Sequence, residues 1–580
     1  MNTATSSLPL QARRIGGRPI LVLALLVAGC SQAEQKQEEV RSVEWNRYYS
    51  TAETHEIMRS YAARHPKLAK LYSIGKSYRG VDLMVMEVTN QDTGAAEDKP
   101  GFYVDGNIHS GELTGSAVTL YLMGRLLDRY GTDAEITELL DTRVFYLRPK
   151  FNPDGADLSL LEDVSLRSTP RPWDDDDDGT ADEDPAEDLN GDGFITQMRI
   201  PDPEGNMKIA GEDPRLMTRR GQGETGGTYY RVVSEGIDSD GDGRLNEDGI
   251  GGIDMNRNFP RNWEPEYLQS GAGPFPLSEP ETYATIQFID ARPNITGIVH
   301  NHTSGGFVYR LPSSSDPTKF NRQDLELILT LGAKYTEMTG RPVRASATDP
   351  VKHRYGTLIG WAYHDRGIIG WVPEYWPGIS ADTDADGSTS ELERLRFIDH
   401  NLGGKYFVDW QPFDHPQLGQ VEIGGWRTRF VTQNPPPELL EQECALQIPW
   451  ILYLARQSPR LTMTDPAITQ LGEGRFQIDV TIRNEGYLPT NLTEQGILAR
   501  VVKPVYASCR VEGGRIEQGE KRADLGHLAG SYPAADPERK SSASVRWLVE
   551  VTSPQAIIWI EALSEKGGNV RSKPIHLGRN

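Results

Sequence analysis

The chain has 580 residues, of which 37% are hydrophobic and 25% charged, so it has the composition of a globular protein with two or three folded units. Its formal net charge of −22 excludes nucleic acids and anionic lipid surfaces as partners, because both would repel it. Much of this charge is local, since residues 174–188 hold ten Asp or Glu and no Lys or Arg. Such a run folds compactly only if cations neutralise it.

The first 30 residues have the pattern of an export signal. Three arginines precede an apolar run at residues 20–28 that is too short to span a bilayer. The run ends in the letters VAGC at Cys30, which resemble the lipobox of bacterial lipoproteins. We therefore expect a lipoprotein-type signal peptide at residues 1–29 and a polar tether at residues 30–43. The protein would be exported and lipid-anchored at Cys30 to the bacterial cell envelope, periplasmic or at the cell surface. The alternative is an ordinary secretory cleavage site with an incidental Cys.

Residues 44–457 alternate strand-like and helical segments, with a large acidic insert at residues 156–252. Apolar runs predict strands at residues 101–105, 144–147, 295–300 and 368–372. Helical spacing of apolar residues predicts helices at residues 113–130, 279–290 and 324–338. This order predicts an α/β fold with a mixed central sheet flanked by helices. In such sheets, functional sites form at the carboxyl ends of the strands.

The pattern changes near the C-terminus. Three prolines at residues 435–437 precede an apolar helix that we expect to pack on the first domain. From residue 458 to residue 580, alternating apolar residues and turn signals predict a C-terminal β-sandwich. Only Cys444 and Cys509 remain besides Cys30, so one disulfide at most can form.

His109 and Glu112 follow the predicted strand at residues 101–105. On a turn that leads into a helix, two residues three apart can converge on one metal ion. A zinc site needs a third protein ligand and an open position for water. Taken alone, this pair also fits a surface His and a Glu that begins a helix, where the helix dipole favours it.

Further motifs follow in order along the chain. They are Phe151-Asn-Pro-Asp154-Gly, Asp254-Met-Asn256-Arg257-Asn-Phe, His302 after the strand at residues 295–300, Gly356-Thr357 with Trp361-Ala-Tyr363, and Trp371-Val-Pro-Glu374-Tyr375. Together with the His109 turn, they resemble the landmarks of the zinc carboxypeptidases, the peptidase M14 (carboxypeptidase A-like) family. The resemblance runs from about residue 45 to about residue 410.

The resemblance implies a zinc ion held by His109, Glu112 and His302. His300 competes with His302 for the third position, and the spacing of the segment after His302 fits the family better. A zinc-bound His needs an acceptor for its other ring nitrogen. Asp154 is the candidate for that second partner.

The resemblance also assigns the substrate and the base. Asn256 and Arg257 match the pair that holds the terminal carboxylate of the substrate, a task for which a planar guanidinium is suited. Glu374 matches the catalytic Glu that takes a proton from water. The residue that lies nearest to the family's substrate-capping Tyr is Tyr355.

Three features leave the site incompletely assigned. Pro373 and Tyr375 flank Glu374 where the family usually has apolar residues. The arginine that stabilises the oxyanion is one of Arg167, Arg171 and Arg199, which all lie in the expected interval. Ile359 aligns with the residue that sets side-chain preference, and its apolar character disfavours basic side chains.

Four Asp-rich loops share the spacing of calcium-binding loops, with oxygen ligands at alternate residues and Gly at the sixth place. We expect them to bind Ca²⁺, although solvated acidic loops remain the alternative. The ligand residues are Asp174, Asp176 and Asp178; Asp188, Asn190 and Asp192; Asp238, Asp240 and Asp242; and Asp382, Asp384, Asp386 and Glu393.

The sequence therefore predicts a zinc metallocarboxypeptidase that hydrolyses the C-terminal peptide bond of peptide or protein substrates with a free C-terminus, using a zinc-activated water and Glu374 as the general base. Its cofactors would be Zn²⁺ and Ca²⁺. Two alternatives stay open: an amidase or endopeptidase of the same fold that acts on cell-wall peptides, and a non-catalytic surface binding protein.

Overall fold

The computed structural model describes residues 43–174, 179–312, 320–346, 354–532 and 539–578. Residues 43–580 form one compact unit. The predicted signal peptide, Cys30 and the tether up to residue 42 lie outside the described residues, as do Asp176 and Asp178. Among the residues described, no helix is both long and apolar enough to cross a membrane.

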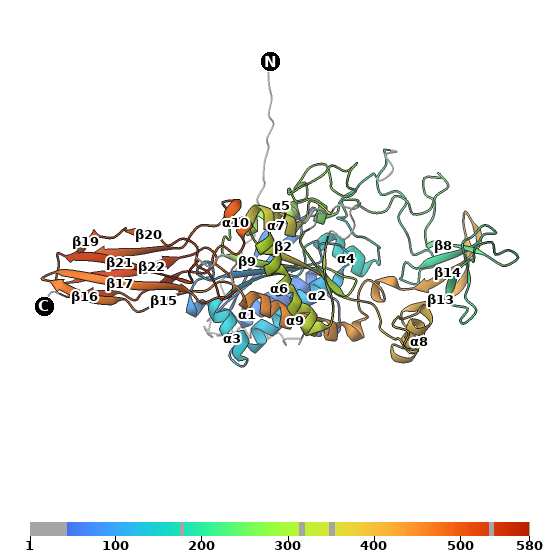
Figure 1. Cartoon of the computed structure of the whole chain (residues 1–580). Coiled ribbons are helices and arrows are strands. Elements are labelled where there is room, and N and C mark those ends of the chain that lie inside the picture. The colour runs from blue at the N-terminus through green and yellow to red at the C-terminus, as the bar shows by residue number, and fades with distance from the viewer. Residues whose placement is uncertain (1–42, 175–178, 313–319, 347–353, 533–538, 579–580) are drawn as a thin grey trace, which may run out of the picture. The chain divides into compact units, whose positions relative to one another are not determined.

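The centre of the unit is a mixed sheet of eight strands (Figure 1). Strands β3, β4, β9 and β12 run parallel to one another, whereas β1, β2 and β10 introduce antiparallel pairs. In order across the sheet, the strands are β1 (Ala69–Lys76), β2 (Asp82–Val88), β4 (Val144–Arg148), β3 (Gly101–Gly106), β9 (Ile295–Asn301), β12 (Ile369–Glu374), β10 (Phe307–Arg310) and β11 (Val343–Ala345).

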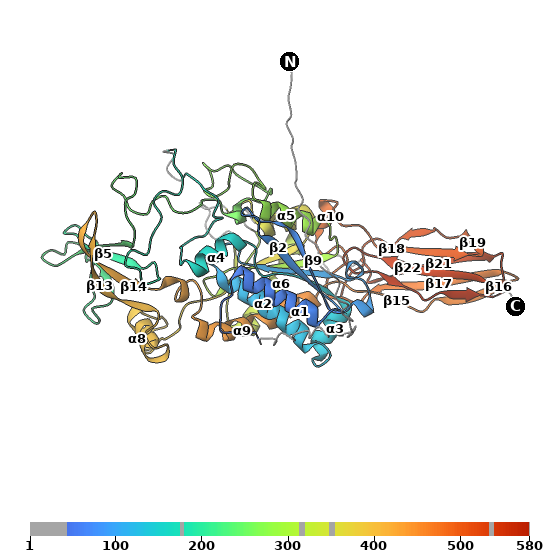
Figure 2. The same ribbon diagram turned by 180° about the vertical axis from the view of Figure 1, so that it is seen from behind.

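Helices cover both faces of this sheet (Figures 1 and 2). On one face Trp371 of β12 packs edge-on against Trp450 of α9, whereas on the other face Ile359 of α7 contacts Gly370. The helices are α1 (Thr51–Arg64), α2 (Leu113–Arg129), α3 (Ala134–Thr142), α4 (Pro153–Leu161), α5 (Pro280–Asp290), α6 (Arg322–Thr339), α7 (Leu358–Arg366), α8 (Glu391–Asn401), α9 (Pro437–Arg456) and α10 (Glu494–Leu498).

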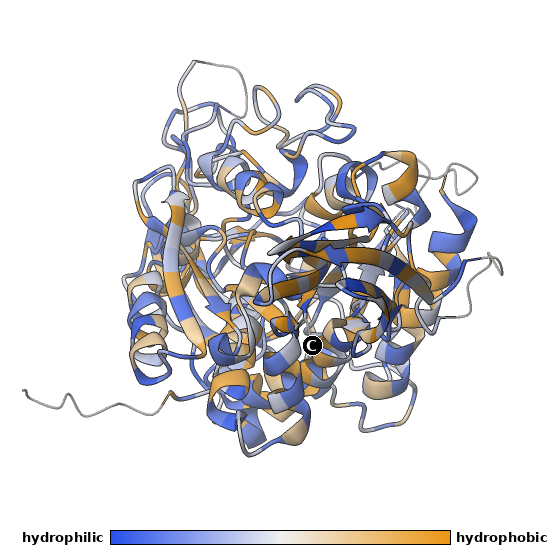
Figure 3. Ribbon diagram, turned by 90° about the vertical axis from the view of Figure 1, so that its left-hand side faces the viewer, coloured by the Kyte–Doolittle hydropathy of each residue, from blue (hydrophilic) through white to orange (hydrophobic). Residues whose placement is uncertain are grey.

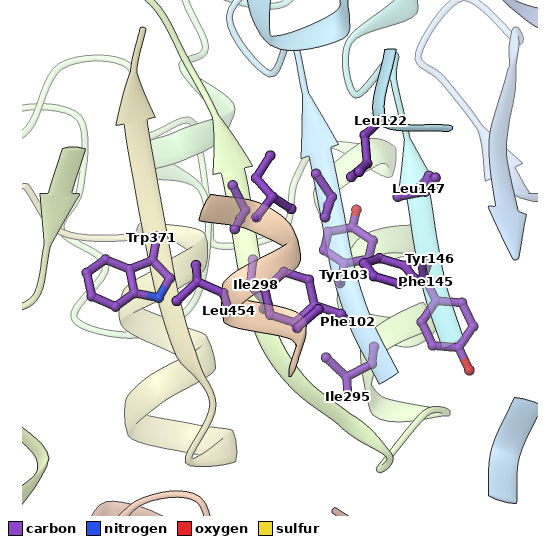
Figure 4. Close-up of a cluster of buried hydrophobic side chains, with 14 of the residues drawn as sticks. Phe102, Tyr103, Leu122, Phe145, Tyr146, Leu147, Ile295, Ile298, Trp371 and Leu454 are labelled. Atoms are coloured by element: carbon purple, nitrogen blue, oxygen red, sulfur yellow. The ribbon is translucent and has the colours of Figure 1, made fainter. Parts of the chain in front are cut away.

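The central strands are buried on both faces, so their sequences are nearly continuous apolar runs rather than alternating ones. Every residue of β3, β4 and β9 is buried. Figure 4 shows buried side chains of β4, β3, β9 and β12 together with Leu122 of α2 and Leu454 of α9. Phe102 packs on Phe145, whereas Tyr103 and Tyr146 on the opposite face pack on Phe288 of α5. This core confirms the predicted α/β class with a mixed, helix-flanked sheet.

The acidic insert contributes to a second sheet that the sequence did not predict. It has six strands in the order β13 (Phe407–His415), β14 (Gly419–Trp426), β5 (Gln197–Pro201), β8 (Tyr230–Ser234), β6 (Met207–Ile209) and β7 (Met217–Arg219). The hairpin β13–β14, which follows Glu374 in the chain, therefore joins the strands of the insert through the pairing of β14 with β5. A small apolar cluster (Met198, Ile200, Val421 and Ile423) and an ion pair between Arg199 and Glu422 hold the two segments together.

Two further antiparallel sheets form the predicted C-terminal β-sandwich. One contains β15 (Leu461–Met463), β16 (Ala467–Gly472), β17 (Arg475–Asn484), β19 (Gly514–Gln518) and β21 (Ser542–Val551). The other contains β18 (Tyr506–Glu512), β20 (Arg522–Asp524), β22 (Ala556–Leu563), β23 (Val570–Arg571) and β24 (Ile575–Leu577).

Hydrophobic and hydrophilic residues alternate along the sandwich strands (Figure 3), as expected for sheets with one buried face. The inward residues form their own core around Trp547, separate from that of the central sheet. Cys444 and Cys509 are buried and free, so the disulfide that the sequence allowed does not form. Burial raises the pKa of the Cys509 thiol to about 12, which leaves it unreactive at neutral pH.

Candidate active site

The first two predicted zinc ligands lie on the turn that joins β3 to α2. The strand ends at Gly106, and α2 begins right after Glu112. Gly106 and Gly115 touch so closely that a Cβ on Gly106 would lie 2.2 Å from the Gly115 backbone, which fixes the turn against the helix. The Asn107 side chain donates hydrogen bonds to the carbonyls of His109 at 2.8 Å and Ser110 at 3.0 Å. The turn is therefore a rigid mount for His109 and Glu112.

His302 reaches the same point from the end of β9. Its Nδ1 lies 2.8 Å from Oε2 of Glu112 and 3.0 Å from Nδ1 of His109. Nδ1 of His109 is in turn 2.8 Å from Oε1 of Glu112. All three side chains are buried, and their candidate ligand atoms lie within 4.8 Å of one another. The structure thus brings together the three residues that the sequence assigned to zinc.

This donor set fits zinc. Two imidazole nitrogens and one carboxylate form the ligand type of catalytic zinc sites, which leave one position open. Ligands roughly 2.0–2.1 Å from a tetrahedral ion lie about 3.3 Å apart, close to the observed separations. Burial lowers the pKa of His302 to about 3, so this ring is neutral, the form that binds metals.

Residues of the segment 254–256 lie beside the two candidate zinc-binding histidines. Nε2 of His109 lies 3.1 Å from Oδ1 of Asp254, a carboxylate that can accept its proton. Nε2 of His302 lies 3.4 Å from the side-chain amide nitrogen of Asn256, which is a donor and does not supply such an acceptor. The prediction that Asp154 orients a zinc ligand is wrong. Asp154 instead accepts hydrogen bonds from Ser77 and from the amide of Arg79, both at 2.8 Å. Asp254 lies in the Asp-Met-Asn-Arg motif, so this motif could have indicated that Asp254 is the acceptor for His109.

His300 is not one of the three residues whose ligand atoms converge. It pairs across the sheet with Asp105 of β3, and its Nδ1 lies 2.6 Å from Oδ1 of that residue. Its ring stands edge-on to His302, with centroids 4.5 Å apart. These contacts favour His302 over His300 as the third ligand, because Nδ1 of His300 is paired with Asp105, whereas Nδ1 of His302 lies among the converging donor atoms.

Glu374 is the last residue of β12 and lies beside His302. The amide of His302 donates to the carbonyl of Pro373 at 2.8 Å, and the amide of Tyr375 donates to the carbonyl of His302 at 3.1 Å. Burial, followed by the negative charge of Glu112, raises the pKa of Glu374 well above its usual range. Tyr375, whose presence next to Glu374 departs from the family, is buried and donates its hydroxyl to Asn301 at 2.5 Å.

Of the three candidate oxyanion arginines, only Arg167 reaches the site. Its Nη1 lies 3.2 Å from Oε1 of Glu112, and its Nε lies 3.0 Å from Oδ2 of Asp254. Its side chain keeps 53% of its surface exposed, so it can still meet a ligand. Arg171 pairs with buried Glu279, and Arg199 pairs with Glu422 in the second sheet.

Asn256 and Arg257 lie in a short 3-10 turn, η3 (Met255–Arg257), next to the zinc ligands. Nη1 of Arg257 donates to the carbonyl of Asn256 at 2.8 Å and lies 3.9 Å from Oδ2 of Asp254. Burial lowers the pKa of Arg257, but a guanidinium stays charged at neutral pH. The long contact with Asp254 leaves this cation only partly compensated, as a site for an anionic ligand requires.

Two further predicted residues lie on the segment before and at the start of α7. Tyr355 exchanges backbone hydrogen bonds with the side chain of Gln269, and its capping role stays a prediction. Ile359 is buried against Gly370 of β12. Arg354, which the sequence reasoning did not single out, is one of the cations that oppose the raised pKa of Glu374.

One hydrogen bond recurs in the Asp-rich loops. In all four loops the amide of the sixth-position Gly donates to the first Asp, at 2.8–3.0 Å: Gly179 to Asp174, Gly193 to Asp188, Gly243 to Asp238 and Gly387 to Asp382. The next alternate residues turn inward in the same way, since Asn190, Asp240 and Asp384 accept from the amides of Asp192, Asp242 and Asp386.

In two of these loops the acidic side chains converge. Asp238, Asp240 and Asp242 offer oxygens within 4.8 Å of one another, and so do Asp382, Asp384 and Glu393. Contact with the Asp238 carboxylate contributes to the raised pKa of Asp240, so the charges of this loop repel one another. The geometry fits a divalent cation, although exposed acidic groups adopt it without one as well.

Comparison with known proteins links this site to a family. The sequence model of the zinc carboxypeptidases (Peptidase_M14) matches residues 54–200 and 207–378, which together exceed half of the chain. A second model, a domain of unknown function (DUF8731), matches residues 460–573 in the sandwich.

Individual relatives match shorter stretches. Carboxypeptidase D of Anas platyrhynchos is 33% identical over 113 residues, which cover 20% of this chain and 8% of that protein. Carboxypeptidase D of Homo sapiens is 35% identical over 103 residues, which cover 18% of this chain and again 8% of the relative. The matches therefore span less than a tenth of these relatives. The crystal structure of carboxypeptidase A from Helicoverpa armigera is 14% identical, covers 72% of this chain and 75% of that chain, and has a TM-score of 0.43.

Proposed function

The chain belongs to the zinc carboxypeptidase family, and on that premise we propose that it removes the C-terminal residue from peptides or proteins with a free C-terminus. One observation carries the proposal: three zinc-type donors converge within 4.8 Å, Glu374 lies beside His302, and Arg257 is bonded to Asn256, whose side chain also contacts His302. A carboxypeptidase needs a cation near its metal site and its general base, because the cation binds the negatively charged C-terminus of the substrate.

Arg257 is proposed to bind the α-carboxylate of the substrate. Its guanidinium can grip a carboxylate through two parallel hydrogen bonds. The contact with the Asn256 carbonyl orients it, and the distant Asp254 does not neutralise it. The scissile bond of the bound chain end then lies over His109, Glu112 and His302.

Glu374 is proposed to act as the general base. A bound Zn²⁺ supplies Lewis acidity and makes water a better nucleophile at neutral pH. Glu374 takes the proton from the attacking water and passes it to the leaving amine. Arg167, held by Glu112 and Asp254, presents N–H groups to the oxygen that becomes negative in the transition state.

The proposal is tested by reading where peptides are cut. Zinc-loaded full-length protein is incubated with peptides of 6–10 residues, and the products are identified by mass spectrometry. Loss of single C-terminal residues, abolished by a zinc chelator and restored by Zn²⁺, supports a carboxypeptidase. Cleavage only at internal bonds or at side-chain amides would indicate the amidase or endopeptidase alternative. Peptide binding without any cleavage would indicate a binding protein.

Calcium binding by the Asp-rich loops is proposed as a structural function. Four loops with the same spacing and the same Gly-to-Asp hydrogen bond support it, as does the convergence of carboxylates in two of them. Alternate oxygen ligands around a Gly turn are the pattern that binds Ca²⁺.

Export and anchoring also remain proposals. The signal pattern at residues 1–29 and Cys30 support a lipoprotein held at the cell envelope. Mass spectrometry of the mature N-terminus tests this directly: a lipidated Cys30 supports the anchor, and an unmodified N-terminus beyond Cys30 contradicts it. The division into a catalytic domain at residues 44–457 and a sandwich at residues 458–580 is proposed on the same terms.

A further inference from the structure

The face of the central sheet that carries Glu374 also carries an arginine at its edge. Strand β10 pairs antiparallel with β12, so Phe307 lies opposite Glu374 and Tyr309 lies opposite Val372. On its other side β10 pairs with β11, where Arg344 is the partner of Tyr309. Because residues paired across a sheet point to the same face, Phe307, Tyr309 and Arg344 share the face of Glu374.

A second arginine reaches this face from the segment before α7. The guanidinium carbon of Arg354 lies 4.9 Å from the centre of the Tyr309 ring. Two residues later, Gly356 packs on Arg257 so closely that a Cβ there would lie 2.1 Å from the Arg257 carbonyl oxygen. Two residues further along the same segment, the amide of Leu358 donates a hydrogen bond to the side-chain oxygen of Asn256. Arg354 is thus placed between the proposed carboxylate clamp and strand β10.

Both arginines keep free N–H groups as far as the described residues go. Among those residues Arg354 donates one side-chain hydrogen bond, to the carbonyl of Ser346 at 2.9 Å, whereas a guanidinium has five N–H groups. Within the described part of the chain, no carboxylate lies at ion-pair distance from Arg344 or Arg354, whereas the nearby Arg341 and Arg366 each have one. We call this set the basic face; its members are Phe307, Tyr309, Arg344 and Arg354.

Apolar groups adjoin the basic face. Val372 lies opposite Tyr309, and further along β12 Gly370 is covered by Ile359, whose Cγ2 would lie 2.5 Å from a Cβ on that glycine. Apolar surface next to a guanidinium suits a side chain with methylene groups and a terminal carboxylate, since the methylenes pack while the carboxylate pairs. A lysine side chain would instead meet repulsion.

From this arrangement we propose that the enzyme prefers substrates whose C-terminal residue has an acidic side chain, Glu above all, and that Arg354 binds that side chain. The inference rests on the proposed function, because it assumes that Arg257 holds the α-carboxylate. Arg354 is then a specificity-determining residue for the residue that leaves. Arg344, with its guanidinium carbon 4.5 Å from the centre of the Phe307 ring, adds positive charge at the outer edge of the basic face.

The test uses zinc-loaded full-length protein and four N-blocked tripeptides that differ only at the C-terminus, which is Glu, Gln, Leu or Lys. Glu and Gln have nearly the same shape, so their ratio of kcat/KM measures the side-chain charge alone. We expect a ratio of about 10 to 100 in favour of Glu, the usual range for a charged hydrogen bond. Arg354→Gln should bring the ratio near 1, Arg354→Lys should keep part of it, and Arg354→Glu should favour Lys.

Arg322→Gln is the matched control, because Arg322 lies on the exposed side of α6 and pairs with Glu326; it should leave the ratio unchanged. Equal cleavage of the Glu and Gln peptides by the unmodified enzyme would overturn the inference while the carboxypeptidase assignment stands. Equal losses on both peptides in Arg354→Gln would also overturn it, since Arg354 would then serve the α-carboxylate. If no peptide loses its C-terminal residue, the proposed function fails first, and the inference fails with it.

Discussion

The buried zinc triad and the exposed Asp-rich loops both gather ligands for a cation, but they hold them in different ways. In the triad each side chain has a partner from another segment, such as Asp254 for His109. In the loops the carboxylates are held by amides of their own loop, such as Gly243 for Asp238. The triad is a site built by the tertiary fold, whereas each loop is a local structure.

This difference separates the expected consequences of losing each metal. The side chains of the triad are held by residues of other segments, so removing zinc should abolish peptide hydrolysis and leave the fold in place. Removing calcium from a loop whose carboxylates repel one another should loosen the acidic insert and leave the triad standing. The two metals should therefore be separable by experiment.

His302→Ala should abolish zinc retention and all detectable hydrolysis, because two remaining ligands do not hold zinc. His300→Ala is the matched change two residues earlier in the chain, and it should retain zinc because His300 pairs with Asp105. Metal content after dialysis, measured by atomic emission, distinguishes the two variants. Zinc loss in the His300 variant with retention in the His302 variant would show that the ligand assignment is reversed.

Glu374→Gln should keep zinc and the fold but slow turnover. Removing a general base typically costs about 10²–10⁴-fold in rate. The measurement is kcat on the preferred peptide, with metal content and circular dichroism to show that the site and fold remain. Near-normal turnover in a zinc-loaded variant would remove Glu374 from its proposed role.

Calcium should raise the melting temperature and protect the insert from proteases. Binding at a hundredfold excess over Kd adds about 2.7 kcal/mol per site to the free energy of unfolding. Asp238→Asn combined with Asp242→Asn should reduce this gain without changing kcat of the zinc enzyme, if the two sites are as separate as proposed. Identical melting curves in Ca²⁺ and in a calcium-selective chelator would refute calcium binding.

Glu281 is a buried carboxylate outside both the zinc triad and the Asp-rich loops, and little in its surroundings stabilises a negative charge. Burial raises its pKa to about 7, and one of its oxygens has no hydrogen-bond partner among the described residues. The folded state therefore holds its proton to higher pH than the unfolded state, whose pKa is about 4.3. The free energy of unfolding should fall as pH rises from about 4.3 to 7 and then level off.

Glu281→Gln removes this penalty and keeps an acceptor for the amide of Tyr78. We expect the variant to be about 3–4 kcal/mol more stable than the parent at pH 8 and nearly equal at pH 4. Urea unfolding at the two pH values measures the difference, with the exposed change Glu326→Gln as a control. A constant difference at both pH values would mean that the carboxylate does not titrate in this window.

The central sheet could be predicted from sequence because its strands are long, apolar and bounded by clear turns. The expected strands at residues 101–105 and 295–300 became Gly101–Gly106 and Ile295–Asn301, and the motifs at their ends gave the triad. The family resemblance has the same origin, since the motifs are local and stand in a fixed order.

The second sheet could not be predicted because its strands come from segments about 200 residues apart. Strand β5 at Gln197–Pro201 is short, and its partner β14 lies at Gly419–Trp426, so neither segment shows the pairing by itself. Contacts between distant segments also decide which of the three candidate arginines reaches the zinc site and which residues surround Arg354. The sequence therefore could not single out Arg167 or Arg354. Asp154 was misassigned because its motif matched, while its partners Ser77 and Arg79 lie in another part of the chain.

The claim that Arg257 reads a free chain end is tested most directly by comparing kcat/KM for one peptide with a free or an amidated C-terminus. Amidation removes the charge and leaves the buried guanidinium without its partner, which costs about 2–5 kcal/mol or roughly 30- to 4,000-fold. We predict a fall of that size for the unmodified enzyme, and Arg257→Ala should erase most of the difference between the two peptides. Equal cleavage of both peptides by the unmodified enzyme would contradict the carboxypeptidase assignment.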